Sequence, residues 1–568
     1  MTPPPHLARP AGRSSPLIWL ALLVAVLVSV PIFSVGTNLF LGGTGDTWQH
    51  LAATVLPSYV LNTVLLCLGV SLGVMVIGIA TAWLVSVYDF PGRAIFEWAL
   101  VLPLAVPAYV MAYTYTDLLQ FVGPLQTWLR ESWGLRPGGY WFPNIRSIGG
   151  AISVFIFVLY PYVYLVVRTA FLERASNMLE VGQSLGLKPW RSFFRISLPL
   201  ARPAVAAGTA LALMETLADY GAVSYFGVQT FTTGIYRAWF SLGDHVAAAQ
   251  LAASLLGVVI LLLFIERGSR GRARFGQASG RQRPAHHHRL RGAAALSASL
   301  ACLLPLTLGF LIPAGTLLYM ALTQGDAQFG ERFFHLARNS FVLAAVTALI
   351  AISLSLLLCY AARGARRALP GLLNRGIGLG YAFPGSVIAV GVLIPVAQLD
   401  RWLDATIYGL TGNHPGLLLT GGIAALVYAY LVRFLTVSLQ SVEASMTKIT
   451  PSMDDAARSL GLGRFPVMWR VHLPLLRGSL LTGALMVFVD VMKELPATLV
   501  MRPFNFDTLA TQAFTLASDE RLGEASTAAL SIVAVGVIPL IFISRQIARG
   551  RQPKSSSNGA EPRPGAVR

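Results

Sequence analysis

Two pairs of carboxylates stand inside otherwise apolar stretches of this sequence. Glu215 and Asp219 are four residues apart, and Asp490 and Glu494 repeat the pair 275 positions later. Side chains at i and i+4 lie on one face of a helix. A charge within a lipid bilayer is costly and usually faces a bundle interior or a water-filled cavity. The four acids predict a cation-attracting path or gate, and the alternative is structural hydrogen bonding between helices, with Lys493 pairing an acid.

The composition indicates the kind of element that must position these acids. Of the 568 residues, 55% are hydrophobic and only 12% are charged, whereas soluble domains carry about 25% charged residues. Twelve apolar runs are long enough to cross the roughly 30 Å of bilayer hydrocarbon. They fall near residues 17–35, 59–87, 94–118, 148–172, 202–225, 247–265, 293–322, 339–362, 376–399, 416–439, 478–501 and 526–544. The sequence therefore predicts an all-α, multi-pass membrane protein.

Charge between the runs predicts the orientation and the organisation of the chain. A cytoplasmic N-terminus puts most Lys and Arg on the cytoplasmic side, as the positive-inside rule requires, and the C-terminus is then cytoplasmic too. Residues 1–16 and the basic tail 546–568 are predicted to be disordered. Residues 17–266 and 293–545 form two six-helix halves, and the Arg-rich segment 267–292 is a cytoplasmic linker. A cleaved signal peptide is the competing interpretation of the first run.

The halves share a polar segment that lies on the cytoplasmic side. Glu180 stands six residues before Gly186 in Ser-Leu-Gly-Leu, and Asp455 stands six before Gly461 in the same tetrapeptide, again 275 positions later. Leu-Pro-Leu follows in both copies. A glycine there permits a positive φ and a tight turn between two short helices. The pattern predicts a repeated helix–turn–helix in the loops 173–201 and 443–476.

The repeat extends beyond these loops. The second run opens with Asn62-Thr-Val-Leu-Leu and the eighth with Asn339-Ser-Phe-Val-Leu. Two six-helix halves of the same orientation imply a pseudo-twofold axis along the membrane normal, which is a parallel repeat.

The polar segment resembles the EAA coupling loop of the permease subunits of ABC importers. Both copies keep the acid and the glycine but replace Glu-Ala-Ala with Glu180-Val-Gly and Asp455-Ala-Ala. The resemblance implies the type I permease fold in a fused two-half form, located in the bacterial inner membrane and surrounded by lipid. It further implies that Glu180, Gly186, Asp455 and Gly461 couple the chain to two copies of an ATP-binding subunit, and that a periplasmic or lipid-anchored binding protein delivers the substrate.

Three stretches look like the fused permeases of ferric-iron importers, namely residues 214–227, 489–498 and 502–507. This resemblance covers about residues 60 to 545 and implies Fe³⁺ as cargo, for which the acids with Tyr113, Tyr115 and Tyr220 offer oxygen ligands. Permeases for thiamine, phosphonate, polyamine, sulfate and molybdate share the coupling loop, so these cargoes remain alternatives. An ion-coupled secondary transporter would also use intramembrane acids, but it has no reason to keep two coupling loops.

No catalytic or cofactor site is expected in this chain. A P-loop needs Gly-x-x-x-x-Gly-Lys-Ser/Thr, and none of the four lysines follows a glycine, so ATP and Mg²⁺ are assigned to the partner ATPase. Cys67, Cys302 and Cys359 lie in apolar runs and indicate neither a disulfide framework nor a zinc site. His286-His287-His288 could bind a metal, although a solvated linker is favoured and no metal site is predicted. The net charge of +18 is ascribed to loops rather than to nucleic-acid binding.

Overall fold

The structure, a computed structural model, describes residues 16–38, 47–184, 186, 189–270, 288–324, 330–364 and 369–550. The terminal segments predicted to be disordered lie almost wholly outside these ranges, as do residues 271–287 of the predicted linker. Within these ranges, eleven helices are long and apolar enough to cross a membrane, or twelve if one sharply bent pair counts as a single span. The prediction of an all-α multi-pass membrane protein is confirmed.

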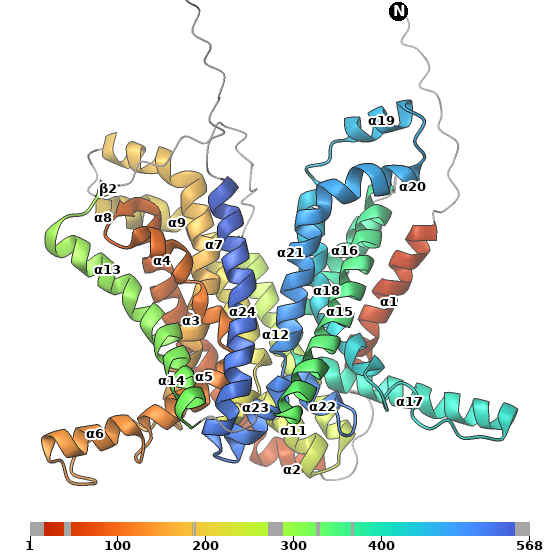
Figure 1. The fold of residues 1–568 in the computed structure, drawn as a ribbon, viewed down its shortest axis with the longest axis horizontal. Helices are drawn as coiled ribbons and strands as arrows, with labels where there is room; N and C mark the ends of the chain where they lie inside the picture. Colours follow the sequence, from red (N-terminus) through yellow and green to blue (C-terminus); the bar gives the residue numbers. More distant parts are fainter. Residues whose placement is uncertain are drawn as a thin grey trace, which may run out of the picture.

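The first half begins with a single apolar helix and continues into a bundle (Figure 1). Its elements are α1 (Pro16–Thr37), α2 (Thr47–Thr54), α3 (Leu56–Val87), β1 (Tyr88–Asp89), α4 (Arg93–Ala99), a 3₁₀ turn (Leu102–Ala105), α5 (Ala108–Leu119), α6 (Pro124–Trp133), α7 (Ile148–Ser184), α8 (Pro189–Ser192), α9 (Leu198–Ala218), α10 (Gly221–Tyr225), α11 (Phe231–Tyr236) and α12 (His245–Arg270).

The second half repeats this order. Its elements are β2 (His288–Arg289), α13 (Gly292–Leu306), α14 (Ile312–Thr323), α15 (Glu331–Gly364), α16 (Leu369–Ile377), a 3₁₀ turn (Gly380–Ala382), α17 (Gly385–Thr411), α18 (Ala424–Met446), α19 (Pro451–Ser459), α20 (Arg464–Val467), α21 (Leu473–Met492), α22 (Pro496–Met501), α23 (Leu509–Ser518) and α24 (Leu522–Gly550). Helices α3, α7 and α9 pack together as α15, α18 and α21 do.

The third and ninth spans differ from the predicted runs because prolines interrupt them. The run 94–118 is not one straight span: Arg93–Ala105 and Ala108–Trp133 meet at 92°. Pro107 is extended there, with φ −59° and ψ 145°, and Pro384 is extended in the same way just before α17. A proline removes a helix hydrogen-bond donor and disfavours helical backbone in the residue before it. The ninth span therefore begins at Gly385 and runs to Thr411, instead of covering 376–399.

An asparagine pair shows that the sequence repeat is also a structural repeat. Asn62 donates a 2.9 Å hydrogen bond from Nδ2 to the carbonyl of Gln229, and Asn339 donates one of 3.1 Å to the carbonyl of Asp507. Each carbonyl belongs to the residue just before a threonine that caps a short helix, α11 or α23. The two asparagines thus hold equivalent loops to equivalent spans.

The first span of each half packs on the opposite half. Helix α1 contacts α15, α16 and α17, whereas α13 contacts α3 and α4, and α14 contacts α5 as well as α24 of its own half. Figure 1 shows α1 beside the second half and α13 beside the first. A two-residue parallel pairing of β1 with β2 also joins the end of the linker to the loop after α3.

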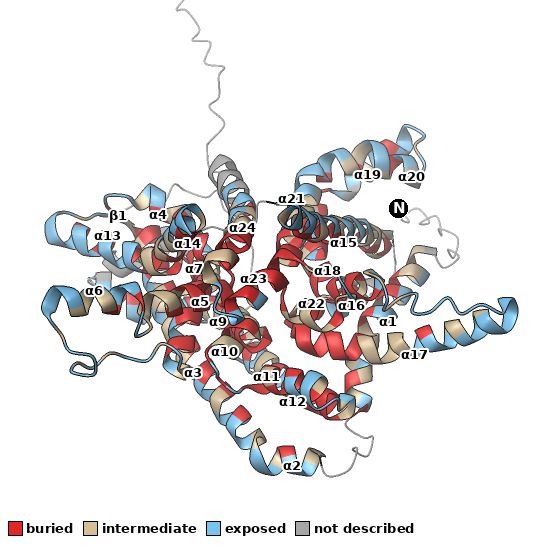
Figure 2. Ribbon diagram, turned by 60° about the horizontal axis from the view of Figure 1, so that its bottom comes forward, coloured by how far each residue is buried: buried red, intermediate tan, exposed pale blue. Residues whose placement is uncertain are grey.

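Burial is concentrated where the two halves meet, as Figure 2 shows by the red segments at the centre of the molecule. On α3, by contrast, Leu61, Leu68, Leu72 and Val76 are exposed, and they repeat at helical spacing on one face. In a protein that crosses a bilayer, such an apolar face is suited to contact lipid.

Candidate functional site

Helix breaks at equivalent points in the two halves place two of the predicted acids. Helix α9 ends at Ala218, and the Asp219 carboxylate accepts hydrogen bonds from the backbone N–H of Ala222 at 2.8 Å and of Val223 at 3.4 Å. Helix α21 ends at Met492, and Glu494 accepts from the N–H groups of the third and fourth residues after it at 3.0 and 3.1 Å. Both acids therefore accept hydrogen bonds from N–H groups at the start of a short helix, which have no acceptor within that helix.

The same breaks shorten two predicted spans. The runs 202–225 and 478–501 were each expected to be continuous, but the helices stop at Ala218 and Met492. Asp219 and Glu494 lie at these breaks, where the first N–H groups of α10 and α22 need an acceptor.

The other two acids are paired with basic side chains. Glu215 Oε2 lies 3.6 Å from Arg433 Nη2, and Asp490 Oδ1 lies 2.9 Å from Lys493 Nζ. Arg433 also reaches Glu494, with 3.4 Å between Nη1 and Oε1. The pairing of Lys493 with an acid was one of the two sequence-based alternatives. Arg433 was missed, although an arginine inside the run 416–439 is the same kind of signal as an intramembrane acid.

All four acids line one cavity between the halves, which we call the chamber. Its volume is about 110 Å³, and Arg433, Lys493 and the tyrosines Tyr109, Tyr162 and Tyr381 also line it. Across the parts of the chain that the structure describes, no three His, Cys, Asp or Glu side chains are placed to hold a metal ion together. The chamber thus brings the four predicted acids together with two basic side chains.

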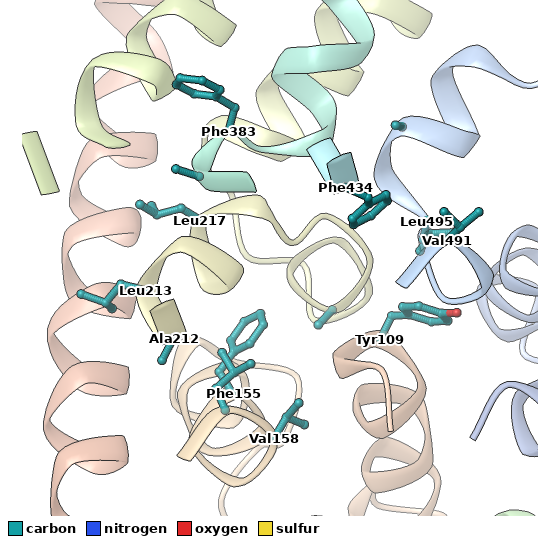
Figure 3. Close-up of a cluster of buried hydrophobic side chains, with 14 of the residues drawn as sticks. Tyr109, Phe155, Val158, Ala212, Leu213, Leu217, Phe383, Phe434, Val491 and Leu495 are labelled. Carbon is teal, nitrogen blue, oxygen red and sulfur yellow. The ribbon is translucent and has the colours of Figure 1, made fainter. Parts of the chain in front are cut away.

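Apolar side chains of both halves surround the chamber. Figure 3 shows Phe155 and Val158 of α7 from the first half, with Phe434 of α18 and Leu495 from the second. All four line the chamber, so its acids and bases face a small space with largely apolar walls. In such surroundings charges interact more strongly than in water.

A larger cavity of about 610 Å³ adjoins the chamber and shares Tyr162, Tyr381, Asp490 and Lys493 with it. Its lining includes Met486, which precedes the chamber residues along α21, and α21 starts at the coupling loop. The larger cavity therefore lies on the coupling-loop side of the chamber. In Figure 1 the two halves also diverge toward α8 and α19.

On the opposite side, aromatic contacts between the halves close the chamber. The Tyr236 hydroxyl donates to the carbonyl of Pro496 across the interface. Tyr220 stacks on Tyr236 with ring centroids 3.6 Å apart, and its ring lies 5.8 Å from that of Phe514. This conformation is therefore open toward the coupling loops and sealed at the other end.

The tyrosines singled out from the sequence are not among the residues that line the chamber. Tyr113 is buried against Tyr225, Tyr115 donates a 2.5 Å hydrogen bond to the carbonyl of Leu308, and Tyr220 belongs to the aromatic seal. The nearest equivalent is Tyr109, one turn before Tyr113. Periodicity alone could not distinguish which face of α5 would meet the other half.

The glycine turns of the coupling loops have the predicted geometry. Gly186 has φ +72° and Gly461 has φ +82°. After α19, Leu462 N–H bonds the carbonyl of Ala457 at 3.1 Å and Gly461 N–H bonds that of Arg458 at 2.9 Å, which is a Schellman motif. Glu180 lies in α7, but its side chain is outside the described residues.

In the second coupling loop, Asp454 makes the contacts to neighbouring elements, whereas the predicted residue was Asp455. Asp454 accepts hydrogen bonds from Arg363 at 2.9 and 3.0 Å and lies 2.6 Å from His472 Nε2. Partial burial would raise the pKa of Asp454, but the hydrogen bonds from Arg363 and His472 outweigh it and lower that pKa. Asp455 instead points outward: its side chain is 66% exposed and 3.8 Å from Arg458. Asp454 was missed because the aligned position of the first half is a leucine, so the repeat did not mark it.

Comparison with known proteins adds a family and several relatives. The family model described as binding-protein-dependent transport system inner membrane component matches residues 11–267. The Fe(3+)-transport system permease protein FbpB 2 of Haemophilus influenzae is 27% identical over 549 residues, covering 93% of this chain and 98% of that protein.

Two further relatives match shorter segments. The probable sulfate transport system permease protein cysT of Chlorokybus atmophyticus is 30% identical over 225 residues, covering 39% of this chain and 76% of its own length. The molybdenum transport system permease protein ModB of Haemophilus influenzae is 28% identical over 211 residues, covering 36% of this chain and 89% of its own.

Proposed function

We propose that this chain, which belongs to the family of binding-protein-dependent transport system inner membrane components, forms the membrane path for ferric iron. It is a multi-pass inner-membrane permease of an ABC importer, in a fused form that holds both halves. Its relatives are transport permeases rather than enzymes. We further propose the identity of the cargo, the number of partner subunits and the orientation of the chain in the membrane.

The net negative charge of the chamber is the main reason to propose a cation as cargo. Among the described residues that line it, four carboxylates face two basic side chains. Sulfate and molybdate are dianions and would meet an excess of negative charge, whereas a multivalent cation would be attracted. Carboxylate and phenol oxygens also suit a hard ion such as Fe³⁺.

The length of the matches supports iron over the oxyanions. The iron-transport relative corresponds to nearly the whole fused chain, while the sulfate and molybdenum relatives each correspond to well under half of it. What their names state holds for those proteins, and iron is carried over to this chain as a proposal.

The proposed mechanism is alternating access. Two copies of an ATP-binding subunit dock at the loops around Glu180–Gly186 and Asp455–Gly461, on the cytoplasmic side together with both termini. Closure of these subunits on ATP and Mg²⁺ draws the loops together, narrows the larger cavity and parts the aromatic seal. A periplasmic or lipid-anchored binding protein then releases cargo into the chamber, where Glu215, Asp219, Asp490 and Glu494 attract it.

Purification of the tagged chain with its partners from native membranes tests this proposal. We expect an ATP-binding subunit and a binding protein that holds Fe³⁺, identified by mass spectrometry and metal analysis. A binding protein that holds sulfate, molybdate or an organic ligand would refute iron but keep the importer. Uptake in vesicles that follows the membrane potential and ignores ATP would instead favour a secondary transporter.

A further inference from the structure

The two bases of the chamber break the symmetry that its acids keep. In the register that aligns the coupling loops, Arg433 corresponds to Val158 and Lys493 to Ala218. Val158 and Ala218 also line the chamber, so equivalent positions face the same space in both halves. The acids are present twice and the bases once, which indicates that the bases serve a purpose specific to the assembled chamber.

Arg433 joins the two halves through its terminal nitrogens. Nη2 faces Glu215 of the first half at 3.6 Å, and Nη1 faces Glu494 of the second at 3.4 Å. The side chain is 9% exposed, so neither pair is screened as a surface pair would be. Both terminal nitrogens of the guanidinium therefore face carboxylates, while its Nε has no hydrogen-bond partner among the described residues.

The backbone of α17 passes close to the ion pair at Gly385. A Cβ on Gly385, at the start of α17, would lie 2.5 Å from Glu494 Oε1 and 3.1 Å from Arg433 Nη1. A side chain at position 385 would therefore require the Glu494 carboxylate or the Arg433 guanidinium to shift.

A second observation points to a ligand in the chamber. Tyr109 is 4% exposed and lines the chamber, and its hydroxyl has no hydrogen-bond partner among the described residues. A buried hydroxyl without a partner is costly. Figure 3 shows the Tyr109 ring of α5 near Leu495 and Val491 of the second half, with its oxygen at the far end. Tyr109 and the four acids line the same chamber.

We propose that the chamber is a multivalent-cation site in which Arg433 is the resident counter-ion. In the cargo-free state Arg433 neutralises Glu215 and Glu494 and ties the halves together at this level. A cargo cation that enters takes its place on the carboxylates, and the contact between Glu215 and the second half is released. Lys493 neutralises Asp490 in the same way, but within one half. The inference rests on the proposed function, since it assumes a cationic cargo.

Terbium luminescence on the purified full-length chain tests the site directly. Tb³⁺ is a hard trivalent ion that emits when a nearby tyrosine is excited, and Tyr109, Tyr162 and Tyr381 line the chamber. Removal of one positive charge from a poorly screened site strengthens cation binding, so we expect Arg433→Gln to bind Tb³⁺ at least about tenfold more tightly than the unaltered chain. Lys493→Gln provides a second variant should Arg433→Gln fail to fold.

Two matched variants make the expected result specific. Arg433→Lys keeps the charge and should bind Tb³⁺ as the unaltered chain does. Glu215→Gln with Arg433→Gln removes one charge of each sign and should return the affinity toward that of the unaltered chain. Equal affinity in Arg433→Gln and the unaltered chain would overturn the inference, as would tighter binding that persists after both Glu215 and Asp490 are neutralised.

Failure of this inference can be separated from failure of the proposed function. If the binding protein carries an oxyanion and Arg433→Gln abolishes its uptake, the iron cargo is refuted. If iron is carried but Arg433→Gln shows no gain in Tb³⁺ affinity, only the role of Arg433 as counter-ion is refuted.

Discussion

Asp454 and His472 are joined by a 2.6 Å contact between Oδ1 and Nε2 that fastens the coupling helix α19 to the start of α21. His472 in turn contacts the Tyr360 hydroxyl of α15 through Nδ1. The first half has no such acid or histidine at the aligned positions. There Trp83 packs on Phe193, with ring centroids 4.7 Å apart. The two coupling loops are thus held by different chemistry, one ionic and one aromatic.

The neighbouring acids Asp454 and Asp455 should have separable roles. Asp454→Asn should lower the melting temperature of the purified chain, because Arg363 and His472 lose a partly buried ionic partner, at a cost of about 1–3 kcal/mol. Asp455→Asn should leave the melting temperature within error and weaken co-purification of the ATP-binding subunit. An equal loss of stability in both variants would contradict this division.

The contribution of Asp454 should depend on pH in a defined direction. The pKa of Asp454 is lower in the folded protein than its ordinary value of 3.8, so its stabilisation is complete above that value and is lost as the pH falls through the folded pKa. Arg363 and His472 are the basic side chains that face it. The difference in melting temperature between the unaltered chain and Asp454→Asn should therefore be largest near neutral pH and shrink below about pH 4. A difference that grows on acidification would be inconsistent with this assignment.

The turn at Gly461 should be sensitive to backbone conformation alone. No atom lies within 4 Å of a Cβ built on Gly461, and its φ is +82°. Gly461→Ala should therefore cost about 1–2 kcal/mol from the left-handed backbone. Gly461→Asn should cost less, since asparagine tolerates this region better. Thermal unfolding and co-purification of the ATPase would be measured for both variants. Equal losses of stability in Gly461→Ala and Gly461→Asn would argue against a strained turn.

Gly385 and Gly409 form a matched pair within α17. A Cβ at Gly385 would press on Glu494 and Arg433, whereas a Cβ at Gly409 would meet nothing within 4 Å. Gly385→Ala should destabilise the protein by about 1–3 kcal/mol through overpacking. Gly409→Ala should be neutral or slightly stabilising, because alanine favours helix. Thermal unfolding of both variants provides the comparison. An unchanged melting temperature in Gly385→Ala would mean that the Glu494 and Arg433 side chains move aside at little cost.

The acids Glu215 and Asp490 are expected to matter for transport. Glu215→Gln with Asp490→Asn should reduce iron uptake by roughly ten- to a hundredfold, since interactions with charged groups contribute about 1.5–3 kcal/mol. The assay is uptake into vesicles that contain the assembled importer, with ATPase activity measured in parallel. Unchanged uptake and unchanged coupling would show that these acids are structural.

Much of the architecture could be predicted because apolar run length and repeat register are local properties. The register of 275 positions paired Glu215 with Asp490 and Asp219 with Glu494, and the structure brings all four to one chamber. It also predicted the positive φ of Gly186 and Gly461. These features depend on residues near one another in the sequence or on exact repetition.

The features that sequence analysis missed depend on contacts between distant segments. Arg433 interacts with Glu215 across more than two hundred residues, and it has no counterpart in the repeat. The helix ends at Ala218 and Met492 were not predicted, because the sequence stays apolar on both sides of each break. The N–H groups that each break leaves without a helical acceptor are bonded by a carboxylate instead. Tyr109 was overlooked in favour of Tyr113 because both lie in the same apolar helix, and only tertiary packing selects between them.

The first membrane span of each half contacts the other half, and this affects what happens when the chain is cut between the halves. Helix α1 packs on α15, α16 and α17 of the second half, and α13 packs on α3 and α4 of the first, while α14 contacts both α5 of the first half and α24 of its own half. Each half therefore clasps the other through a helix that it contributes, independently of the peptide that connects them. A protease site engineered between residues 271 and 287 should yield two fragments that migrate as a single particle in mild detergent after cleavage, because separating them would require both helices to be withdrawn through the lipid.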